Sequence, residues 1–374
     1  MWKAALEGLA MNPSFWKGKR VFVTGHSGFK GTWLSMLLLE LGAEVTGYSL
    51  LPPSSPCLSD LVGLHRLLNS IEGDVCEYQR MKRALEHFRP QIVIHMAAQS
   101  LVRRSYQDPL TTYSTNIMGT VNLLEALRHV EGIRAVVNVT SDKCYENRGT
   151  ARGYREGEPL GGRDPYSSSK ACAELITSAF RNSFFSSTTN GNSGIHLASA
   201  RAGNVIGGGD WAADRLIPDM IRAFSKNEPV KIRNPKARRP WQHVLEPIMG
   251  YLKLTERLWS AQALYADAWN FGPSISAAKP VGWITQYVAK RWGHGAKWEL
   301  DEAEHHHESL CLKLNSTKSR LRLGWSPSFN LRESLDWTIS WYKRFYSGED
   351  ARAITLEQLH AFMKLSSTKV RAID

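Results

Sequence analysis

The stretch "VFVTGHSGFKGTWLSMLLLELGAEVTGYSL", residues 21–50, decides the fold of this chain. A short β-branched run is followed by three spaced glycines and then by a long apolar-periodic segment, which predicts a strand, a tight turn and a helix. Glycine loses more conformational entropy on folding than any other residue. Gly25, Gly28 and Gly31 are therefore expected only where a ligand or another part of the backbone approaches the turn closely. The far end, Tyr48–Leu50, carries no acidic residue.

The strand, the glycine spacing and the helix together predict a dinucleotide site. The first glycine would make the turn, the second would let a pyrophosphate approach the backbone, and the third would let the helix meet the strand. The phosphates would lie on the helix N-terminus, where free N–H groups and the helix dipole favour anions. A glycine-rich turn without a ligand is the alternative. Since residues 48–50 offer neither a carboxylate for ribose hydroxyls nor an arginine for a 2′-phosphate, they leave NAD and NADP open.

Two further segments extend this predicted cofactor site. "GDV", residues 73–75, places Asp74 after an apparent third strand, where its carboxylate can accept a hydrogen bond from an adenine amino group. "HMAAQ", residues 95–99, ends a strand with small residues that let a cofactor lie across the sheet edge. The residues expected at the cofactor are Thr24, Gly25, His26, Gly28, Phe29, Lys30, Gly31, Asp74, Val75, Ala97, Ala98, Thr140, Tyr166 and Lys170.

Length and charge bound the function. A chain of 374 residues predicts two domains or lobes around separate cores. The net charge of +12, from 47 Lys and Arg against 35 Asp and Glu, leaves nucleic-acid binding as one interpretation. The basic residues are spread along the chain, however, and the densest cluster, "NPKARRPW" at 234–241, equally suits a positive cleft for a small anionic substrate. We therefore expect no nucleic-acid partner.

Cysteine usage predicts a reducing compartment. The five cysteines, at positions 57, 76, 144, 172 and 311, are odd in number and form no CxxC pair, which favours reduced thiols in the cytoplasm over disulfides. No run approaches the roughly 18 apolar residues of a membrane span. The N-terminal residues lack the apolar core of a secretory signal.

Strand-like and helix-like segments alternate through the first half of the chain. The expected strands are "RVFVT" (20–24), "AEVTGYSL" (43–50), "QIVIHMAA" (91–98), "AVVNVTS" (135–141) and "IHLASARAGNVIG" (195–207). Helical segments between them predict βαβ units, right-handed crossovers and an α/β fold with a doubly wound parallel sheet. From about residue 205, Gly-, Pro- and Trp-rich segments predict a smaller, less regular C-terminal substrate lobe.

These patterns predict four parts of the chain. Residues 1–18 form an N-terminal extension, and residues 19–204 form a dinucleotide-binding domain that strands and helices from later segments complete. Residues 205–348 mainly form the substrate lobe, and residues 349–374 form a peripheral helix with a frayed tail.

The segment "PYSSSK", residues 165–170, places Tyr166 and Lys170 four residues apart and hence on one face of a helix. A lysine ammonium close to both a phenol and a cofactor ribose favours tyrosinate and lowers the phenol pKa. YxxxK alone is a weak motif that most often marks a surface pair. Here it follows a dinucleotide turn and the strand-end stretch "NVTSDKCY", and this combination is specific.

The chain resembles the extended short-chain dehydrogenases/reductases and, among them, the nucleotide-sugar 4,6-dehydratases that act on CDP-glucose. The stretches that carry the resemblance span about residues 15–345: "VTGHSGFKGTWL", "HMAAQSLVRRSY", "TSDKCYEN", "EPLGGRDPYSSSKACAEL", "SARAGNVIGGGDWAADRLIPD" and "RPWQHVLEP". The resemblance implies a Rossmann domain, NAD as cofactor, conversion of CDP-glucose to CDP-4-keto-6-deoxyglucose and water, and a place in deoxysugar biosynthesis for O-antigen lipopolysaccharide.

The resemblance also implies roles for individual residues. Tyr166, as tyrosinate, takes the proton of the C4 hydroxyl while hydride leaves C4 for NAD; Ser141 hydrogen-bonds O4; and Asp142 is the general acid at the C6 hydroxyl. Lys143 stands where many related dehydratases have glutamate as the C5 base. An ammonium cannot accept a proton, so Lys143 is either a base with a lowered pKa, beside Arg103 and Arg104, or an electrostatic stabiliser of the enolate.

Substrate phosphates require donors, and arginine forks suit a diphosphate well. The residues expected at the substrate are Arg103, Asn204, Arg215, Arg239 and His243, with Trp241 as an aromatic support for the base or ribose and Arg238 as a weaker candidate. The run "HHH" at 305–307 lacks accompanying ligands at metal spacing, so we expect a loop near the nucleotide end of the cleft and no metal site.

Other functions stay open at this point. An epimerase, or a dehydratase of dTDP-, UDP- or GDP-sugars, shares the fold, and a nucleotide-sensing binding module would need neither Tyr166 nor Lys170. The helices expected at 113–128 and 167–184 carry more apolar residues than one buried face requires. Together with the resemblance, this predicts a homodimer through a four-helix bundle.

Overall fold

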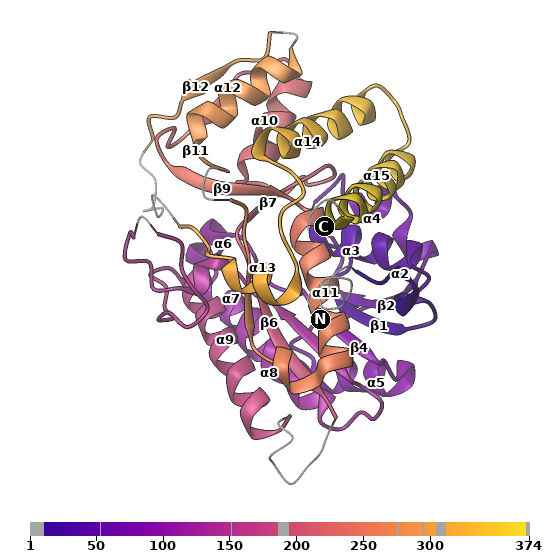
Figure 1. Ribbon diagram of the computed structural model, residues 1–374. Helices are drawn as coiled ribbons and strands as arrows, with labels where there is room; N and C mark the ends of the chain where they lie inside the picture. The colour runs from indigo at the N-terminus through magenta and orange to yellow at the C-terminus, as the bar shows by residue number, and fades with distance from the viewer. Residues whose placement is uncertain are drawn as a thin grey trace.

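The main sheet confirms the doubly wound parallel architecture. The computed structural model describes residues 11–52, 54–150, 152–185, 194–274, 277–293, 295–303 and 312–371. Seven parallel strands lie in the order β10-β6-β5-β4-β1-β2-β3 (Figure 1). Their bounds are β1 Arg20–Thr24, β2 Glu44–Ser49, β3 Asn69–Glu72, β4 Ile92–His95, β5 Ala135–Val139, β6 His196–Ala202 and β10 Ala268–Phe271. The chain runs outward from β1 in both directions, so the strand order reverses between β1 and β4.

Helices cover both faces of this sheet. One face carries α5 (Tyr78–Phe88), α8 (Gly119–Leu127) and α9 (Pro165–Ser183), and α6 (Val102–Gln107) and α7 (Pro109–Tyr113) lead into α8 through a π-helical turn at Ser114–Met118. The other face carries α3 (Phe29–Glu40) and α11 (Leu245–Ala261), with α2 (Pro13–Trp16) and α4 (Leu58–Leu61) beside α3.

The strand sequences explain why both faces are covered. In β1, Val21 and Val23 belong to the core beneath α3 and α11, whereas Phe22 belongs to the core beneath α5 and α8. Successive side chains of a strand point to opposite faces, so an uninterrupted apolar strand requires a hydrophobic layer on each side.

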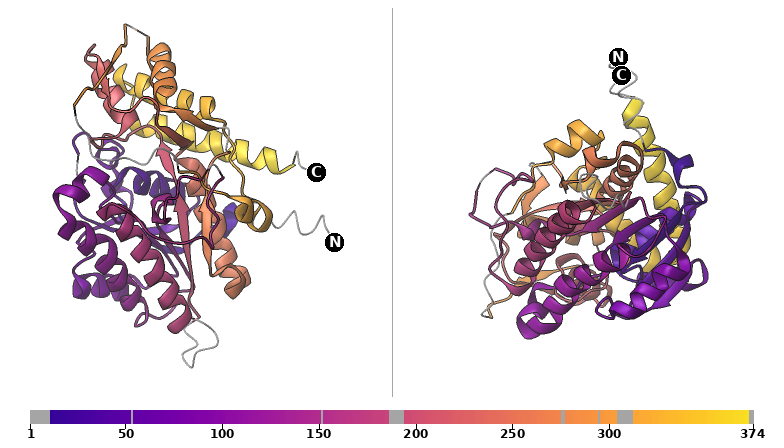
Figure 2. Two further views of the ribbon diagram at one scale, coloured as in Figure 1. Left: turned by 90° about the vertical axis from the view of Figure 1, so that its left-hand side faces the viewer. Right: turned by 90° about the horizontal axis from the view of Figure 1, so that it is seen from below.

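The smaller lobe lies over the carboxyl edge of the sheet, as the orange and yellow segments in the left view of Figure 2 show. It contains a three-stranded sheet in the order β11-β9-β7 and a parallel pair, β8 and β12. The strand bounds are β7 Asn204–Ile206, β8 Val230–Ile232, β9 Arg238–His243, β11 Ala278–Pro280 and β12 Trp298–Leu300. Its helices are α10 (Leu216–Ser225), α12 (Val281–Trp292) and α14 (Leu331–Tyr346), while α13 (Thr317–Leu323) packs near β10.

Two segments differ from their sequence-based expectations. The single strand expected over residues 195–207 is divided between two sheets, with β6 in the main sheet and β7 in the lobe, and Gly203 lies at the change of direction. The helix expected after Gly348 is α15 (Ala351–Arg371), which packs against α3, α4 and α14 and buries Ile354, Leu359 and Phe362 in the main core. The end of the chain therefore supports the helix that follows the glycine turn.

Candidate active site

A cleft of about 1080 Å³ lies between the carboxyl edge of the main sheet and the lobe. It is lined by the glycine turn, by the ends of β2, β4 and β5, by the start of α9, and by β7, β8 and β9 of the lobe. In an open α/β sheet, ligands bind outside the carboxyl ends of the strands where the strand order reverses. The volume suits a dinucleotide together with a second ligand.

The three glycines of the turn have separate structural reasons. A Cβ atom added to Gly25, whose φ is +74°, would lie 2.7 Å from the backbone nitrogen of Ala97, and one added to Gly31 would lie 2.1 Å from the carbonyl oxygen of Gly25. A Cβ on Gly28 would meet only that carbonyl oxygen, at 3.4 Å, which is an ordinary contact. Packing therefore explains Gly25 and Gly31, whereas Gly28 faces the cleft at the N-cap of α3. This pattern fits a pyrophosphate approaching the backbone at Gly28.

Most of the residues predicted at the cofactor line the cleft: Gly25, Gly28, Phe29, Lys30, Gly31, Asp74, Val75, Ala97, Ala98, Thr140, Tyr166 and Lys170. The carbonyl of Asp74 accepts a hydrogen bond from the Tyr48 hydroxyl at 3.0 Å, and its Oδ1 accepts one from the Cys76 backbone N–H at 2.9 Å. Burial and the nearby positive charges of Arg215 and Lys170 lower the pKa of Lys30 to about 8.

Thr24 and His26 do not line the cleft, so their contact with the cofactor stays a prediction. The Thr24 hydroxyl lies 2.6 Å from Nδ1 of His95 and accepts hydrogen bonds from the N–H groups of Met96 and Ala97. The His26 ring contacts the hydroxyls of Ser49 and Ser70, and burial lowers its pKa to about 4. Both residues are buried because they join the turn to the neighbouring strands.

Tyr166 and Lys170 lie at the start of α9 and face the cleft. The helix begins with Asp164, whose carboxylate accepts a hydrogen bond from the Ser167 N–H at 2.9 Å, followed by Pro165 in the first turn. Burial lowers the pKa of Lys170 to about 8, although the Glu174 carboxylate opposes this shift. Burial raises the pKa of Tyr166 to about 12, although a hydrogen bond with Ser141 opposes it. Within the protein alone the phenol pKa thus shifts opposite to the prediction, because desolvation of the tyrosinate outweighs the nearby positive charge.

Ser141, Asp142 and Lys143 follow β5 in a short 3-10 turn, Asp142–Cys144. Ser141 Oγ accepts a hydrogen bond from the Lys143 N–H at 3.2 Å and donates one to Asp142 Oδ1 at 3.1 Å. Burial raises the pKa of the Asp142 carboxyl, opposed by the charges of Lys143 and Arg239. A Cβ on Gly203 would lie 3.1 Å from Asp142 Oδ2, so this glycine makes room for the carboxyl group. The cleft thus joins a buried carboxylic acid to the tyrosine and lysine of α9.

Four of the five predicted substrate residues also line the cleft: Arg103, Asn204, Arg215 and Arg239. Arg103 pairs with Asp214 at 3.0 Å, and Arg215 pairs with Asp210 at 2.9 Å and donates to Ser100 Oγ at 3.0 Å. These ion pairs hold the guanidinium groups at the wall of the cleft. Lys143, Arg104 and Trp241 line it as well, whereas Arg238 is an exposed residue at the start of β9.

His243 does not line the cleft, which corrects its prediction as a substrate residue. Strand β9 runs from exposed Arg238 into the core, and the His243 ring packs edge-on against Trp33, Phe329 and Trp337. Complete burial lowers its pKa to about 3, so the ring is a neutral core residue.

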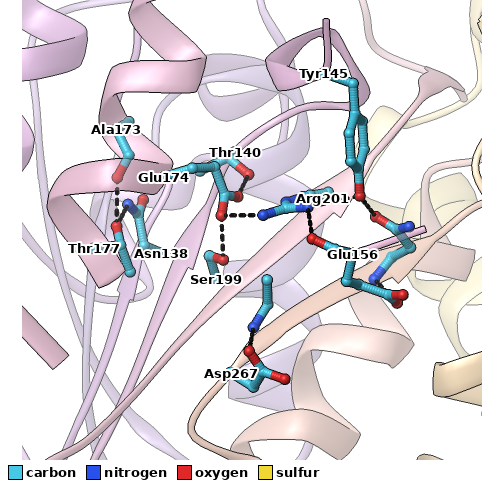
Figure 3. Close-up of polar contacts among 12 residues, drawn as sticks. Asn138, Thr140, Tyr145, Glu156, Ala173, Glu174, Thr177, Ser199, Arg201 and Asp267 are labelled. Atoms are coloured by element: carbon cyan, nitrogen blue, oxygen red, sulfur yellow. Dashed lines mark hydrogen bonds and ion pairs between the residues drawn. The ribbon is translucent and has the colours of Figure 1, made fainter. Parts of the chain in front are cut away.

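Sequence reasoning missed several residues of the site. Trp211, Lys231, Arg233 and Asn234 line the cleft from the lobe. Trp211 lies in the stretch "SARAGNVIGGGDWAADRLIPD" and Asn234 begins the basic cluster "NPKARRPW", but neither residue was singled out. Sequence reasoning also missed a buried Glu174–Arg201 ion pair behind the cleft (Figure 3). Two signals for this pair existed: Glu174 repeats the four-residue spacing of Tyr166 and Lys170, and Arg201 is a charged residue within the small and apolar run "LASARA".

The described residues also bear on metal binding and on membrane insertion. They contain no cluster of three His, Cys, Asp or Glu side chains arranged to hold a metal ion, and His305–His307 lie outside them. Within the same ranges, none of the helices has the length and apolar character that crossing a membrane requires.

Comparison with known proteins identifies close relatives in sequence. Residues 22–338 match the family model described as GDP-mannose 4,6 dehydratase. CDP-glucose 4,6-dehydratase of Salmonella typhimurium is 51% identical over 357 residues, which cover 96% of this chain and 99% of the relative. A dTDP-glucose 4,6-dehydratase of Streptomyces griseus is 26% identical over 87% of this chain and 95% of its own length.

Solved structures support the fold. UDP-glucose 4-epimerase of Thermotoga maritima superposes with a TM-score of 0.75 at 21% identity, covering 87% of this chain and 99% of that one. The dTDP-glucose 4,6-dehydratase of Streptomyces venezuelae, solved with NAD, superposes with a TM-score of 0.72 at 22% identity, covering 87% and 98%. From the family match and the 51% identical relative, together with this fold, it follows that the chain belongs to the GDP-mannose 4,6 dehydratase family within the extended short-chain dehydrogenases/reductases.

Proposed function

We propose that this protein is an NAD-dependent hydro-lyase that converts CDP-glucose to CDP-4-keto-6-deoxyglucose and water. The observation that carries the proposal is the shared cleft of Tyr166, Lys170 and the buried acid Asp142, in a chain 51% identical to a CDP-glucose 4,6-dehydratase. Oxidation at C4 and elimination across C5 and C6 require different proton-transfer groups, and the cleft holds both.

We infer that residues of α9 carry out the proton transfer in the first half of the reaction. Tyr166, as tyrosinate, accepts the C4 hydroxyl proton, and Ser141 hydrogen-bonds the sugar O4. Lys170 stabilises the tyrosinate through its positive charge. The glycine turn, Asp74, Ala97 and Ala98 would hold NAD, which would supply the hydride acceptor for C4, the hydride donor for C6, where a proton at C5 completes the reduction, and a positive charge.

We infer that residues of the turn after β5 carry out the elimination in the second half of the reaction. Once C4 is a ketone the C5 proton is acidic, and the C6 hydroxyl leaves as water with a proton from Asp142. A carboxyl group whose pKa is raised by burial is suited to donate this proton. We infer that Lys143 stabilises the enolate or takes the C5 proton, and that the arginines of the lobe and of α6 bind the diphosphate.

The end of β2 bears on how firmly NAD is retained. Ser49 closes the strand, and its hydroxyl contacts Nδ1 of His26 at 3.1 Å and donates to Ser27 Oγ at 2.8 Å. This position offers hydroxyls rather than a carboxylate to the adenosine ribose. We therefore expect weaker retention of NAD than in relatives with an acid at the end of β2.

We also infer a homodimer through α9 and the continuous helical segment 109–127, which α7, the π-helical turn Ser114–Met118 and α8 form. Leu110, Met118 and Leu175 are 80%, 50% and 58% exposed on these two helical segments, and Tyr113 and Phe184 are exposed nearby. Several large apolar side chains on adjacent helices are unusual on a monomer. Four helices, two from each copy, would bury them. The cytoplasmic location and the link to O-antigen biosynthesis remain predictions.

The decisive experiment follows one hydrogen. The protein is incubated with NAD and CDP-glucose deuterated at C4, with dTDP-, UDP- and GDP-hexoses as substrate controls, and products are analysed by NMR. We expect a 4-keto-6-deoxy sugar from CDP-glucose with the label at C6. Label lost to water, label retained at C4 of an epimer, or turnover of another nucleotide sugar alone would contradict the proposal.

Two variants separate the halves of the reaction. Tyr166→Phe removes the base, so no absorbance at 340 nm from reduced cofactor should develop. Asp142→Asn keeps the shape of the side chain but cannot act as the acid, so absorbance at 340 nm and a 4-keto-hexose should accumulate on the enzyme. Losses of about 100-fold or more in turnover are expected for each. An epimerase would not depend on Asp142 in this way.

A further inference from the structure

A buried ion pair joins helix α9 to strand β6 behind the cleft (Figure 3). Arg201 Nη2 lies 2.8 Å from Glu174 Oε2, and the two side chains are only 4% and 3% exposed. Glu174 lies one helical turn beyond Lys170 and two beyond Tyr166, on the same face of α9. Neither Glu174 nor Arg201 lines the cleft. Because desolvation offsets most of the attraction between buried charges, stability alone does not account for this pair.

The carboxylate of Glu174 contacts the residue that precedes the turn Ser141–Cys144, which carries Asp142 and Lys143. The hydroxyl of Thr140, the residue that precedes Ser141, donates a hydrogen bond to Glu174 Oε1. Ser199 Oγ donates to Glu174 Oε2 at 2.6 Å, which ties the same carboxylate to β6. The residue before the turn is thereby fixed to the helix of Tyr166 and Lys170.

The guanidinium of Arg201 holds the end of the same turn. Its Nη1 donates to the hydroxyl of Tyr145 at 2.6 Å and to the carbonyl of Glu156 at 2.9 Å. Tyr145 directly follows the turn Asp142–Cys144, and its hydroxyl donates to Asn270 Oδ1 at 2.8 Å. Figure 3 shows the guanidinium between the Glu174 carboxylate and the Tyr145 hydroxyl.

We propose that Glu174 and Arg201 are positioning residues that hold both ends of the Ser141–Cys144 turn against α9 and so set the placement of Asp142 and Lys143 for elimination. This inference rests on the proposed function, which assigns elimination to those two side chains. Tyr166 and Lys170 are placed by α9 itself, whereas Asp142 and Lys143 are placed by a turn whose flanking residues depend on the pair. Loosening the turn should therefore slow elimination more than oxidation.

Three variants weaken these links while leaving Glu174 in place. Thr140→Val removes the hydroxyl at the start of the turn, and Tyr145→Phe removes the hydroxyl at its end. Arg201→Lys keeps a positive charge beside Glu174, but a single ammonium lacks the planar fork that reaches Glu174 and Tyr145 together.

The matched control is Thr177→Val. Thr177 Oγ1 accepts a hydrogen bond from Asn138 Nδ2 at 2.7 Å, so it also joins β5 to α9, but it leads to no residue of the turn (Figure 3). Both this variant and Thr140→Val remove one buried hydroxyl between the same two elements. A general loss of stability should therefore affect them alike.

Single turnovers at saturating NAD and CDP-glucose are followed at 340 nm, with thermal unfolding measured in parallel. In Tyr145→Phe and Arg201→Lys, we expect the rise in absorbance to stay within about threefold of wild type and its decay to slow by about tenfold to 100-fold, because small misplacements of reacting groups cost that much. In Thr140→Val, whose residue also lines the predicted cofactor site, both phases can change, and we expect the decay to slow more than the rise. Thr177→Val should leave both phases unchanged even where its unfolding temperature falls. Combining Arg201→Lys with Tyr145→Phe should add little, because both break the same link.

The possible outcomes distinguish the two proposals. If the link variants slow both phases equally, slow neither, or match Thr177→Val, the positioning role is wrong while the proposed function stands. If the wild-type protein gives no reduced cofactor and no 4-keto sugar from CDP-glucose, the proposed function fails and the positioning role fails with it.

Discussion

Substituting each glycine of the turn by alanine separates the needs of the fold from those of a ligand. A Cβ on Gly31 would overlap the carbonyl oxygen of Gly25 at 2.1 Å, and a Cβ on Gly25 would press on the backbone of Ala97 at 2.7 Å. A Cβ on Gly28 has only an ordinary contact at 3.4 Å. Each variant carries the same glycine-to-alanine substitution, so any difference between the variants comes from the surroundings of the substituted residue.

The expected magnitudes follow from these contacts. Backbone atoms cannot rotate away, so Gly31→Ala should lower the free energy of unfolding by about 3 kcal/mol, at the upper end of overpacking. Gly25→Ala adds a left-handed backbone, at φ +74°, which costs a further ~1–2 kcal/mol. Gly28 has an extended N-cap conformation, with φ −70° and ψ 162°, that alanine also adopts, so its variant should lose less than about 1 kcal/mol. Its methyl group would instead occupy the approach of the pyrophosphate and weaken NAD binding by about tenfold or more, or ~1.4 kcal/mol.

Urea unfolding gives the stability of each variant, and calorimetric titration with NAD gives the affinity of those that fold. We expect opposite results for two of the variants. Gly28→Ala should be nearly as stable as wild type and bind NAD weakly, whereas Gly31→Ala should be destabilised. If Gly28→Ala bound NAD as tightly as wild type, the pyrophosphate would not approach this glycine. If it lost as much stability as Gly31→Ala, the packing argument for the turn would be wrong.

Two further predictions concern the lobe and the dimer. Arg239→Ala should raise the KM for CDP-glucose about tenfold or more with little change in stability, because Arg239 lines the cleft. His243→Ala should lower the free energy of unfolding by about 3 kcal/mol and leave KM unchanged, because it leaves a cavity in the core. Steady-state kinetics and urea unfolding test both variants, and a raised KM in His243→Ala would show that His243 belongs to the substrate site. Light scattering of the wild-type protein should give twice the 42.0 kDa of one chain, and Leu175→Glu on α9 should give the mass of one chain. Leu321→Glu on α13, a site that is more exposed than Leu175 but lies on another helix, should leave the dimer intact, and a wild-type mass near 42.0 kDa would contradict the dimer.

Local patterns in the sequence predicted most of the main sheet, though not its edge strand β10, and the first part of the site. Continuous apolar strands, the glycine turn and the i, i+4 pair of Tyr166 and Lys170 are all short-range features, and each can be read within one element and its neighbours. The resemblance to the dehydratases added Ser141, Asp142 and Lys143, which the structure places in the same cleft.

Long-range packing decided what the sequence did not show. Arg239 and His243 lie four positions apart in β9, a spacing that places both on the same face of a regular strand. Only the fold determines that the strand carries His243 into an aromatic core and leaves Arg239 in the cleft. The division of residues 195–207 between two sheets likewise depends on where the lobe sits. Glu174 and Arg201 are 27 residues apart, and their pairing requires α9 to lie on β6.

The same burial acts in opposite ways on Asp142 and Tyr166, the two side chains proposed as proton-transfer groups. It raises the pKa of Asp142, which favours the protonated form that elimination needs. It also raises the pKa of Tyr166 to about 12, which disfavours the tyrosinate that oxidation needs. Formation of the tyrosinate therefore requires positive charge near Tyr166. Lys170 supplies only part of this charge, because burial lowers its own pKa to about 8 and so reduces its protonated fraction. We expect the positive charge of bound NAD to supply part of what Tyr166 requires, so that cofactor binding and activation of the tyrosine are coupled, whereas the raised pKa of Asp142 comes from burial in the fold itself.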